Sequence, residues 1–321
     1  MFYRTAESVS PKHPDKLCDQ ISDAILDAYL KEDPNARVAA EVCGGHGVVF
    51  VTGEITSTAS DIDIPAIVHR IAGDNIIVHT NISKQSPEIA QGVDTGGAGD
   101  QGIMIGFACD ETPELLPLEV VLSRRLNQYI FNKYPFDGKT QITIAPNGTI
   151  ESIVASFQNA PSTELTKIVK EFVENNNLKG KLEFHINPAG DWNQGGFDSD
   201  AGLTGRKLVI DNYGPRVAIG GGCYSGKDSS KVDRSAAYMA RRVAVDYLRK
   251  RHAHEVLVRL AYAIGYAEPL EQTVIIDGEP EEIKDYDLTP NGIIKYLNLR
   301  RPIFEQTAKW GHYGEGFDWD K

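Results

Sequence analysis

Amphipathic helical segments alternate with pairs of short strand-like segments along this chain, and this alternation constrains the fold more than any other feature. Apolar residues recur at helical spacing from Leu17 to Ala28, in Leu116–Tyr134 and in Ser162–Asn175. Runs such as Arg37–Val42 and Val48–Ile55 are instead typical of strands. Because the strands come in adjacent pairs, we predict an α+β fold with helices on one face of largely antiparallel sheets.

The other predicted elements continue this pattern. Asn147-Gly148 is a strong hairpin signal between strands at Thr140–Ala145 and Thr149–Phe157. Further helices are expected at Pro65–Ala72, Ser235–Arg251 and Pro290–Leu297, and further strands at Asn75–Ile82, Leu182–Ile186, Leu208–Ile210, Val256–Ile264 and Thr273–Ile276. Three glycine-rich stretches, 86–102, 190–205 and 220–226, are expected to be loops. A chain of 321 residues is long enough for two or three domains.

The composition restricts the function. Hydrophobic residues make up 41% and charged residues 24%, as in ordinary globular proteins. The net charge of -12 disfavours non-specific nucleic-acid binding, which requires neutralisation of phosphates. A nucleotide site in so acidic a chain would need a local cluster of Lys and Arg.

The four cysteines and the apolar runs indicate the compartment. Cys18, Cys43, Cys109 and Cys223 form no Cys-x-x-Cys pair and have no zinc spacing with histidine. A disulfide framework is improbable at this size, so we expect a reducing compartment. No apolar run approaches 18 residues, and the N-terminus has no signal-like apolar segment. The expected location is cytoplasmic, without a membrane span.

The segment most informative about chemistry is GGGCYSGKDSSKVDR, residues 220–234. Glycines let backbone N–H groups surround an anion, Lys227 and Lys231 add positive charge, and Asp233 could bind a metal. The segment nearly matches a phosphate-binding loop, but Asp228 stands where Ser or Thr is required, which disfavours a P-loop ATPase. The alternative is a glycine-rich turn with solvated lysines.

Three shorter segments allow both a functional and a structural interpretation. HPDK, residues 13–16, begins the first helix, where Asp15 is favoured by the helix dipole as either a cap or a site residue. GAGDQG, residues 97–102, suits an exposed carboxylate or a plain surface loop. DAGLTGRK, residues 200–207, provides Arg206 for a phosphate or forms a salt-bridged turn.

Taken together and in this order, the four segments closely resemble the methionine adenosyltransferase family of bacterial and eukaryotic type. The last segment matches as GGGCYSGKDSSKVDRSAAY. Further matching stretches are DQISDAILDAYL, VTGEIT, KQSPEIAQGVD, AYAIGYAEP and RPIFEQTAKWGHYG. The similarity covers nearly the whole chain, which is far more specific than any single motif.

The resemblance implies a fold, an assembly and a reaction. It implies three α+β domains related by a pseudo-threefold axis, at 1–88, 98–194 and 196–321, interwoven and with a gating loop at 86–97. It also implies a homodimer with active sites at the interface, which often pairs into a homotetramer. The implied reaction makes S-adenosylmethionine by attack of the sulfur of L-methionine on C5′ of ATP. The released triphosphate is then hydrolysed to pyrophosphate and phosphate.

The resemblance also assigns roles to residues. His13 would hydrogen-bond the oxygen that leaves C5′. The triphosphate would be held by Lys139, Arg206, Lys227 and Lys231, and the rest of ATP would be contacted by Asp137, Trp192, Asp200, Lys207 and Cys223. Trp192 occupies the position of an adenine-stacking phenylalanine. Methionine would be contacted by Glu54, Gln85, Asp100, Asp200 and Lys231. Asp15 and Asp233 would bind two Mg²⁺ ions, and Glu41 would help to bind K⁺.

Several positions depart from the family pattern. Lys12 replaces a glycine, Asp191 replaces an arginine, and Cys223 and Tyr224 replace Ala and Phe. The gating loop and the segment before Asp137 are shortened. Two alternatives follow: an enzyme of this fold with altered substrate preference, which Asp191 and the short loop motivate, and a non-catalytic partner subunit that binds ATP. The presence of all the expected metal and phosphate residues argues against the second.

Overall fold

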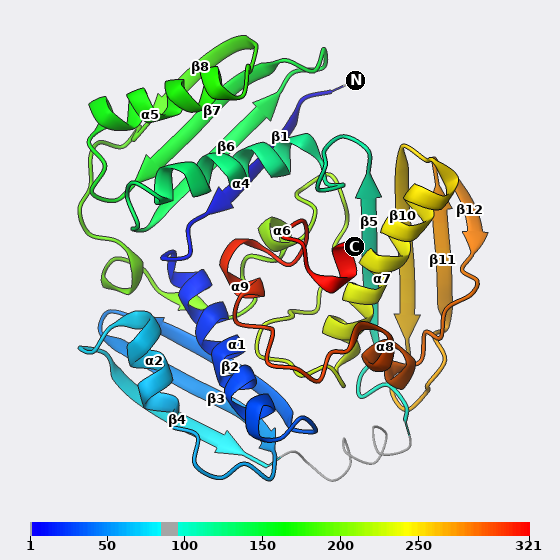
Figure 1. Cartoon of the computed structure of the whole chain (residues 1–321). Helices are drawn as coiled ribbons and strands as arrows, with labels where there is room; N and C mark the ends of the chain where they lie inside the picture. Colours follow the sequence, from blue (N-terminus) through cyan, green and yellow to red (C-terminus); the bar gives the residue numbers. More distant parts are fainter. Residues whose placement is uncertain (1, 85–95) are drawn as a thin grey trace.

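Three four-stranded sheets surround a central region in the computed structural model, which describes residues 2–84 and 96–321 (Figure 1). The N-terminal sheet has the order β4-β3-β2-β9, the central sheet β1-β6-β7-β8 and the C-terminal sheet β12-β11-β10-β5. The strands are β1 (Arg4–Val9), β2 (Arg37–Gly45), β3 (Val48–Thr56), β4 (Ile77–Ser83), β5 (Gly102–Cys109), β6 (Gly138–Ile144), β7 (Ile150–Phe157), β8 (Gly180–Ile186), β9 (Gly202–Leu203), β10 (Glu255–Tyr262), β11 (Glu271–Ile276) and β12 (Glu279–Glu282).

Helices cover one face of each sheet, and the long helices α1, α4 and α7 pass in front of the sheets in Figure 1. The helices are α1 (Pro14–Glu32), α2 (Ile64–Ala72), α4 (Leu118–Phe131), α5 (Ser162–Asn175), α6 (Leu208–Asp211), α7 (Val232–Arg251), α8 (Pro290–Leu297) and α9 (Thr307–Trp310), with short 3-10 turns η1 (Gly196–Asp198) and η2 (Asp318–Asp320). No helix in the described ranges is long and apolar enough to cross a membrane. The fold class predicted from the sequence is confirmed.

The topology repeats three times. A long helix precedes each hairpin: α1 before β2 and β3, α4 before β6 and β7, and α7 before β10 and β11. The strand on the other side of each hairpin comes from elsewhere: β9 pairs with β2, β1 with β6 and β5 with β10, all antiparallel. Each of these edge strands precedes the long helix of a different unit, so the three units exchange strands cyclically. Among the strands of the described residues, only β3–β4 and β7–β8 pair in parallel.

Alternating burial in the strands gives each sheet a buried inner face and an exposed outer face. Helix α1 buries Leu17, Ile21 and Ile25 in the core that also contains Val38 and Val51. Burying each such side chain contributes about 1.5–3 kcal/mol. The neighbouring positions of each strand point to the face that carries no helix, because side chains alternate along a strand. This outer face is where several candidate residues lie.

Two sets of elements differ from the sequence prediction. Leu208–Ile210, predicted as a strand, lies in helix α6. Its β-branched residues favour a strand, but Asp211 at the end of this helix accepts a hydrogen bond from the buried Lys16 at 2.6 Å, and this tertiary contact determines the local backbone. Strands β1, β5, β9 and β12 were not predicted.

The four cysteines, all in the described part of the chain, are free thiols.

Candidate active site

The segments 13–16 and 200–207 meet at Asp15. Its carboxylate accepts the Leu203 N–H at 2.9 Å, the Arg206 Nε–H at 2.9 Å and the Lys207 ammonium at 2.5 Å. Burial alone would raise the pKa of this carboxyl, but the hydrogen bonds from Lys207 and Leu203 lower it overall. Asp15 is therefore a buried anion fixed between two cations.

His13 is the N-cap of α1. Its Nδ1 accepts the Asp15 N–H at 3.2 Å, so the capping role suggested for Asp15 belongs to His13. Burial, followed by the charges of Lys207 and Lys139, lowers the pKa of His13 to about 3. The imidazole is thus neutral near pH 7. Because Nδ1 accepts, the geometry assigns the proton to Nε2, where it can be donated to a ligand.

The segments 220–234 and 97–102 meet at Asp233, in the first turn of α7. Lys227 Nζ lies 2.5 Å from the Asp233 carboxylate, and the Lys227 backbone bridges to Ala39 of β2. A Cβ at Gly222 would lie 2.1 Å from Asp233 Oδ1, and one at Gly102 would lie 3.2 Å from the same atom. Glycine at these two positions therefore lets both loops approach the carboxylate closely.

Asp228, which breaks the phosphate-loop pattern, fixes the loop instead. Its carboxylate accepts the Val38 N–H of β2 at 2.7 Å and also pairs with Lys231. The glycine-rich segment is thus attached to the N-terminal sheet at Asp228 and at Lys227. Its lysines are paired with carboxylates, which contradicts the alternative of solvated lysines.

The two pairs of segments touch at Gly205 and Cys223. A Cβ at Gly205, where φ is +79°, would lie only 2.5 Å from the Cβ of the half-buried Cys223. All four sequence segments therefore converge on one region, with His13, Asp15, Arg206 and Lys207 on one side of this contact and Lys227, Lys231 and Asp233 on the other.

Lys139 and Trp192 lie together over the central sheet. Lys139 of β6 pairs in register with Ser156 of β7, and the Ser156 hydroxyl accepts the Trp192 indole N–H at 3.1 Å. Trp192 also lines a cavity of about 290 Å³. Asp137 is buried and accepts the Gly196 N–H at 3.0 Å, so it anchors the chain that follows Trp192.

The remaining predicted residues are more dispersed. Glu41 and Glu54 are exposed on β2 and β3, the two inner strands of the N-terminal sheet, and Glu54 pairs in register with Ala39, the residue bridged by Lys227. Asp200 is close enough to contribute to the electrostatics of His13. Asp100 accepts the N–H of its neighbour Gln101 at 2.8 Å. Gln85 and loop residues 86–95 lie outside the described residues.

Sequence reasoning missed one buried cluster that supports the site. Lys16 pairs with Asp211 at 2.6 Å and with Asp19 at 3.1 Å, and all three side chains are buried. Asp19 also accepts the Gly205 N–H at 2.8 Å, although burial raises its pKa to about 6. The only sequence signal for this cluster was the i, i+3 spacing of Lys16 and Asp19, in a helical turn whose other side chains face the core.

The carboxylates suit metal ions that share their coordination with a substrate. No group of three or more His, Cys, Asp or Glu side chains is placed to hold a metal in the described ranges. Mg²⁺ at phosphate-binding sites usually takes only one or two carboxylates and completes its octahedron with phosphate oxygens and water. Asp15 and Asp233, two separate carboxylates beside cationic groups, fit this pattern.

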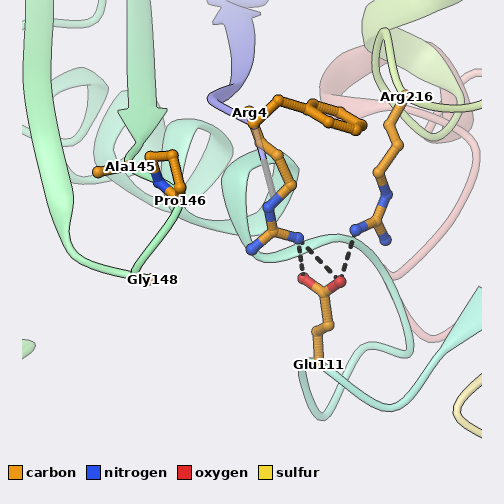
Figure 2. A pocket seen from close by; sticks show the side chains of 7 residues that line it. Arg4, Glu111, Ala145, Pro146, Gly148 and Arg216 are labelled. Atoms are coloured by element: carbon orange, nitrogen blue, oxygen red, sulfur yellow. Dashed lines mark hydrogen bonds and ion pairs between the residues drawn. The ribbon is translucent and has the colours of Figure 1, made fainter.

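A cavity of about 360 Å³ near the start of β1 is of a different kind (Figure 2). Its two arginines, Arg4 and Arg216, both bind Glu111, at 2.7 and 2.6 Å. Glu111 also accepts the Leu118 N–H at the start of α4. The buried carboxylate of Glu119, 3.3 Å from Arg4, supplies a second negative charge. The two arginine charges are therefore balanced by two carboxylates, and the cluster attaches β1 to α4.

Sequence models of three domains match almost the entire chain. They are the S-adenosylmethionine synthetase N-terminal domain at residues 1–87, the central domain at 95–192 and the C-terminal domain at 194–321. The chain belongs to the S-adenosylmethionine synthetase family. The enzymes of this family are methionine adenosyltransferases that use ATP and methionine, and they are generally metal-dependent.

A curated relative supports the assignment to the S-adenosylmethionine synthetase family. The S-adenosylmethionine synthase of Clostridium tetani is 43% identical over 366 positions, which cover 97% of this chain and 93% of the relative. Because the aligned length exceeds the 321 residues of this chain, part of the alignment consists of gaps in it. This chain is therefore a shortened version of the same architecture.

Proposed function

We propose that this protein synthesises S-adenosylmethionine by attack of methionine sulfur on C5′ of ATP. The observation that carries the proposal is the convergence of two carboxylate–cation groups, Asp15 with Arg206 and Lys207, and Asp233 with Lys227. Such a region can bind a triphosphate together with its cations. It also reconciles a polyanionic substrate with the net charge of -12.

The chemistry requires stabilisation of a leaving group more than activation of a nucleophile. The neutral thioether sulfur donates a lone pair to C5′ in line, the C–S bond forms, and the C5′–O bond breaks with its electron pair going to the triphosphate. Negative charge therefore grows on the leaving oxygen. His13 Nε2–H would donate to this oxygen, and Lys139, Arg206, Lys227 and Lys231 would face the triphosphate. Fixed donors aimed at developing charge supply a large share of many rate enhancements.

The ion pairs of the site would be exchanged when substrates bind. Lys207 and Lys227 would turn from Asp15 and Asp233 to phosphate oxygens, and the two carboxylates would hold Mg²⁺. When bound, the two Mg²⁺ ions would neutralise charge on the triphosphate. Glu41, beside Lys227, would help to hold K⁺. Retention of the released triphosphate on the same cations would allow its hydrolysis to pyrophosphate and phosphate.

The two substrates would lie against different sheets. Trp192 would stack on adenine over the central sheet, with Asp137, Asp200 and Cys223 lining the ATP side. Methionine would lie toward Glu54, Gln85, Asp100 and Lys231. Because Lys139, Glu41 and Glu54 point to sheet faces that carry no helix, we infer a homodimer in which these faces are covered by a second copy.

The test is incubation of the purified protein with ATP, methionine, Mg²⁺ and K⁺, followed by mass spectrometry. We expect S-adenosylmethionine, pyrophosphate and phosphate. ATP binding without any product across a wide range of methionine concentrations would contradict the proposal and favour a non-catalytic subunit. Product formed only with a methionine analogue would indicate altered substrate preference.

A further inference from the structure

Asp191 binds the start of a helix that has no local cap. Helix α5 begins after Pro161, whose side chain makes no capping hydrogen bond. The Asp191 carboxylate, 29 residues after Ser162, accepts the Ser162 N–H at 3.0 Å and also the Ser162 hydroxyl. It therefore supplies from a distance an acceptor for one of the first-turn N–H groups, which have no partner within the helix.

The same contacts hold the segment that carries Trp192. Asn187 donates its side-chain N–H to Asp191 at 3.1 Å, and the Trp192 carbonyl accepts the Asn159 N–H at 2.9 Å. The indole N–H is bound to Ser156. The segment is thus attached to β7, to the β7–α5 connection and to the first residue of α5.

We propose that Asp191 is a positioning residue for the adenine site, because it fixes the Trp192 segment against α5 and so sets the indole over β7 beside Lys139. The inference rests on the proposed function, in which Trp192 stacks on adenine. An arginine, which the family has at this position, has no acceptor and could not bind the Ser162 N–H. Aspartate in place of arginine therefore removes a cation near the nucleotide and adds a contact between the Trp192 segment and α5.

This positioning role predicts that loss of the Asp191 contact weakens binding of the adenine base but not binding of the triphosphate. Removing an aromatic platform costs about 5- to 150-fold in affinity per stacked base. Asp191→Ala should loosen Trp192 without removing it, so we expect AMP-PNP binding with Mg²⁺ to weaken by about three- to tenfold. Binding of inorganic tripolyphosphate with Mg²⁺ should change by less than about twofold, because the cations that bind it are untouched. Correspondingly, the KM for ATP should rise while kcat and the KM for methionine change little.

A second variant separates positioning from helix capping. Pro161 has extended backbone angles, φ −58° and ψ 137°, which an Asp N-cap can adopt. The double variant Asp191→Ala with Pro161→Asp should regain thermal stability through a local cap but should not regain AMP-PNP affinity. Asp191→Asn keeps an acceptor and should bind nearly as the wild type does. Glu164→Gln, which removes an exposed charge from the same helix turn, is the matched control.

Calorimetric titrations of the full-length variants with the two ligands decide the matter. Equal weakening of both ligands, unchanged AMP-PNP affinity in Asp191→Ala, or full recovery in the double variant would each overturn the inference. Wild-type protein that bound neither ligand would overturn the proposed function and this inference with it. That result differs from any effect confined to the Asp191 variants.

Discussion

At the scale of single residues, the charged side chains of the candidate site are paired with one another. Asp15 faces Lys207 and Asp233 faces Lys227, each at 2.5 Å. The side chains that would bind metal are thus neutralised by those that would bind phosphate. Substrate binding therefore exchanges partners rather than creating new charge, and removal of one member leaves the other uncompensated in a partly buried place.

Lys231→Ala and Asp233→Asn should each lower kcat by about 100- to 1000-fold, because each removes one charged contact near the leaving triphosphate. Circular dichroism and the melting temperature should show that the fold is retained. Lys167→Ala, which removes an exposed lysine from α5, should leave kcat unchanged. Near-normal turnover in both site variants would place the phosphate site elsewhere.

Sequence reasoning identified most of the charged residues but not their partners. The segments containing Asp15, Arg206, Lys227 and Asp233 stand out as motifs, and the structure brings them together. Asp191 was identified only as a departure from the family. Its contact with Ser162 joins residues 29 positions apart, and no local pattern encodes such a contact.

At the scale of elements, local periodicity predicted the helices well and the edge strands poorly. Ser162–Asn175 and Pro290–Leu297 were predicted with the bounds that the structure has. Strand β1 lies against β6, more than 100 residues away, and it was missed because it begins the chain without a neighbouring hairpin partner. The short α6 was mistaken for a strand because the buried Lys16–Asp211 contact overrides β-branched propensity.

The loop before Lys227 depends on a glycine for its shape. Gly226 has φ +81°, and a Cβ there would lie 1.9 Å from the Ala40 carbonyl oxygen of β2. Gly226→Ala should therefore cost about 1–2 kcal/mol of backbone strain plus about 1–3 kcal/mol of overpacking. It should also lower kcat by displacing Lys227. Urea denaturation and steady-state kinetics provide the measurements.

The matched control is Gly221→Ala. Gly221 has φ +103°, but a Cβ there would meet nothing within 4 Å. This variant should show only the backbone strain, and its turnover should change less. Equal losses of stability in the two variants would show that the close approach of residue 226 to β2 does not affect the free energy of unfolding.

Helix α1 contains a group whose titration should affect stability. Asp27 accepts the N–H groups of Phe304 and Glu305, and burial raises its pKa to about 6, against 3.8 for the free side chain. The folded state therefore binds a proton more readily than the unfolded state between these values. This group opposes folding at pH 7 and ceases to do so as the pH falls through about 6 toward 4.

Asp27→Asn should remove this dependence while keeping an acceptor for the two N–H groups. Relative to the variant, the wild type should gain about 1–2 kcal/mol of unfolding free energy between pH 7.5 and 5. Urea denaturation of both proteins at the two pH values measures the difference. A constant difference would show that Asp27 has an ordinary pKa in the folded protein.

At the scale of the whole molecule, three units share their strands in a cycle. Because β9 completes the N-terminal sheet, β1 the central sheet and β5 the C-terminal sheet, no unit has a complete sheet without another. The sequence indicates three similar units only through the family resemblance, since it contains no strong repeat. The exchange brings the segment after β9, with Arg206 and Lys207, next to Asp15 at the start of α1.

The outer face of the N-terminal sheet carries apolar side chains beside candidate site residues. Phe50 is 53% exposed, Ile77 60% and Leu203 37%, and the Phe50 ring stacks on His79 at 5.0 Å. Glu54 is exposed on β3, the strand of Phe50, and Glu41 is exposed on the neighbouring β2. Exposed apolar side chains gathered on a sheet face that no helix covers are typical of an interface.

Phe50→Glu should therefore disrupt both the proposed homodimer and the activity. A carboxylate buried without a partner at the dimer interface should raise the dimer dissociation constant by at least about 100-fold. Sedimentation equilibrium should then show a dimer for the wild type and a monomer for the variant at the same concentration. Tyr296→Glu, at an equally exposed tyrosine on α8, should remain dimeric and active, because the helix layer lies on the opposite side of its sheet. Because Glu41, Glu54 and Lys139 are open to solvent in a single chain, kcat should fall in proportion to the monomer fraction. A Phe50→Glu protein that stayed monomeric with full turnover would show that one chain forms a complete active site.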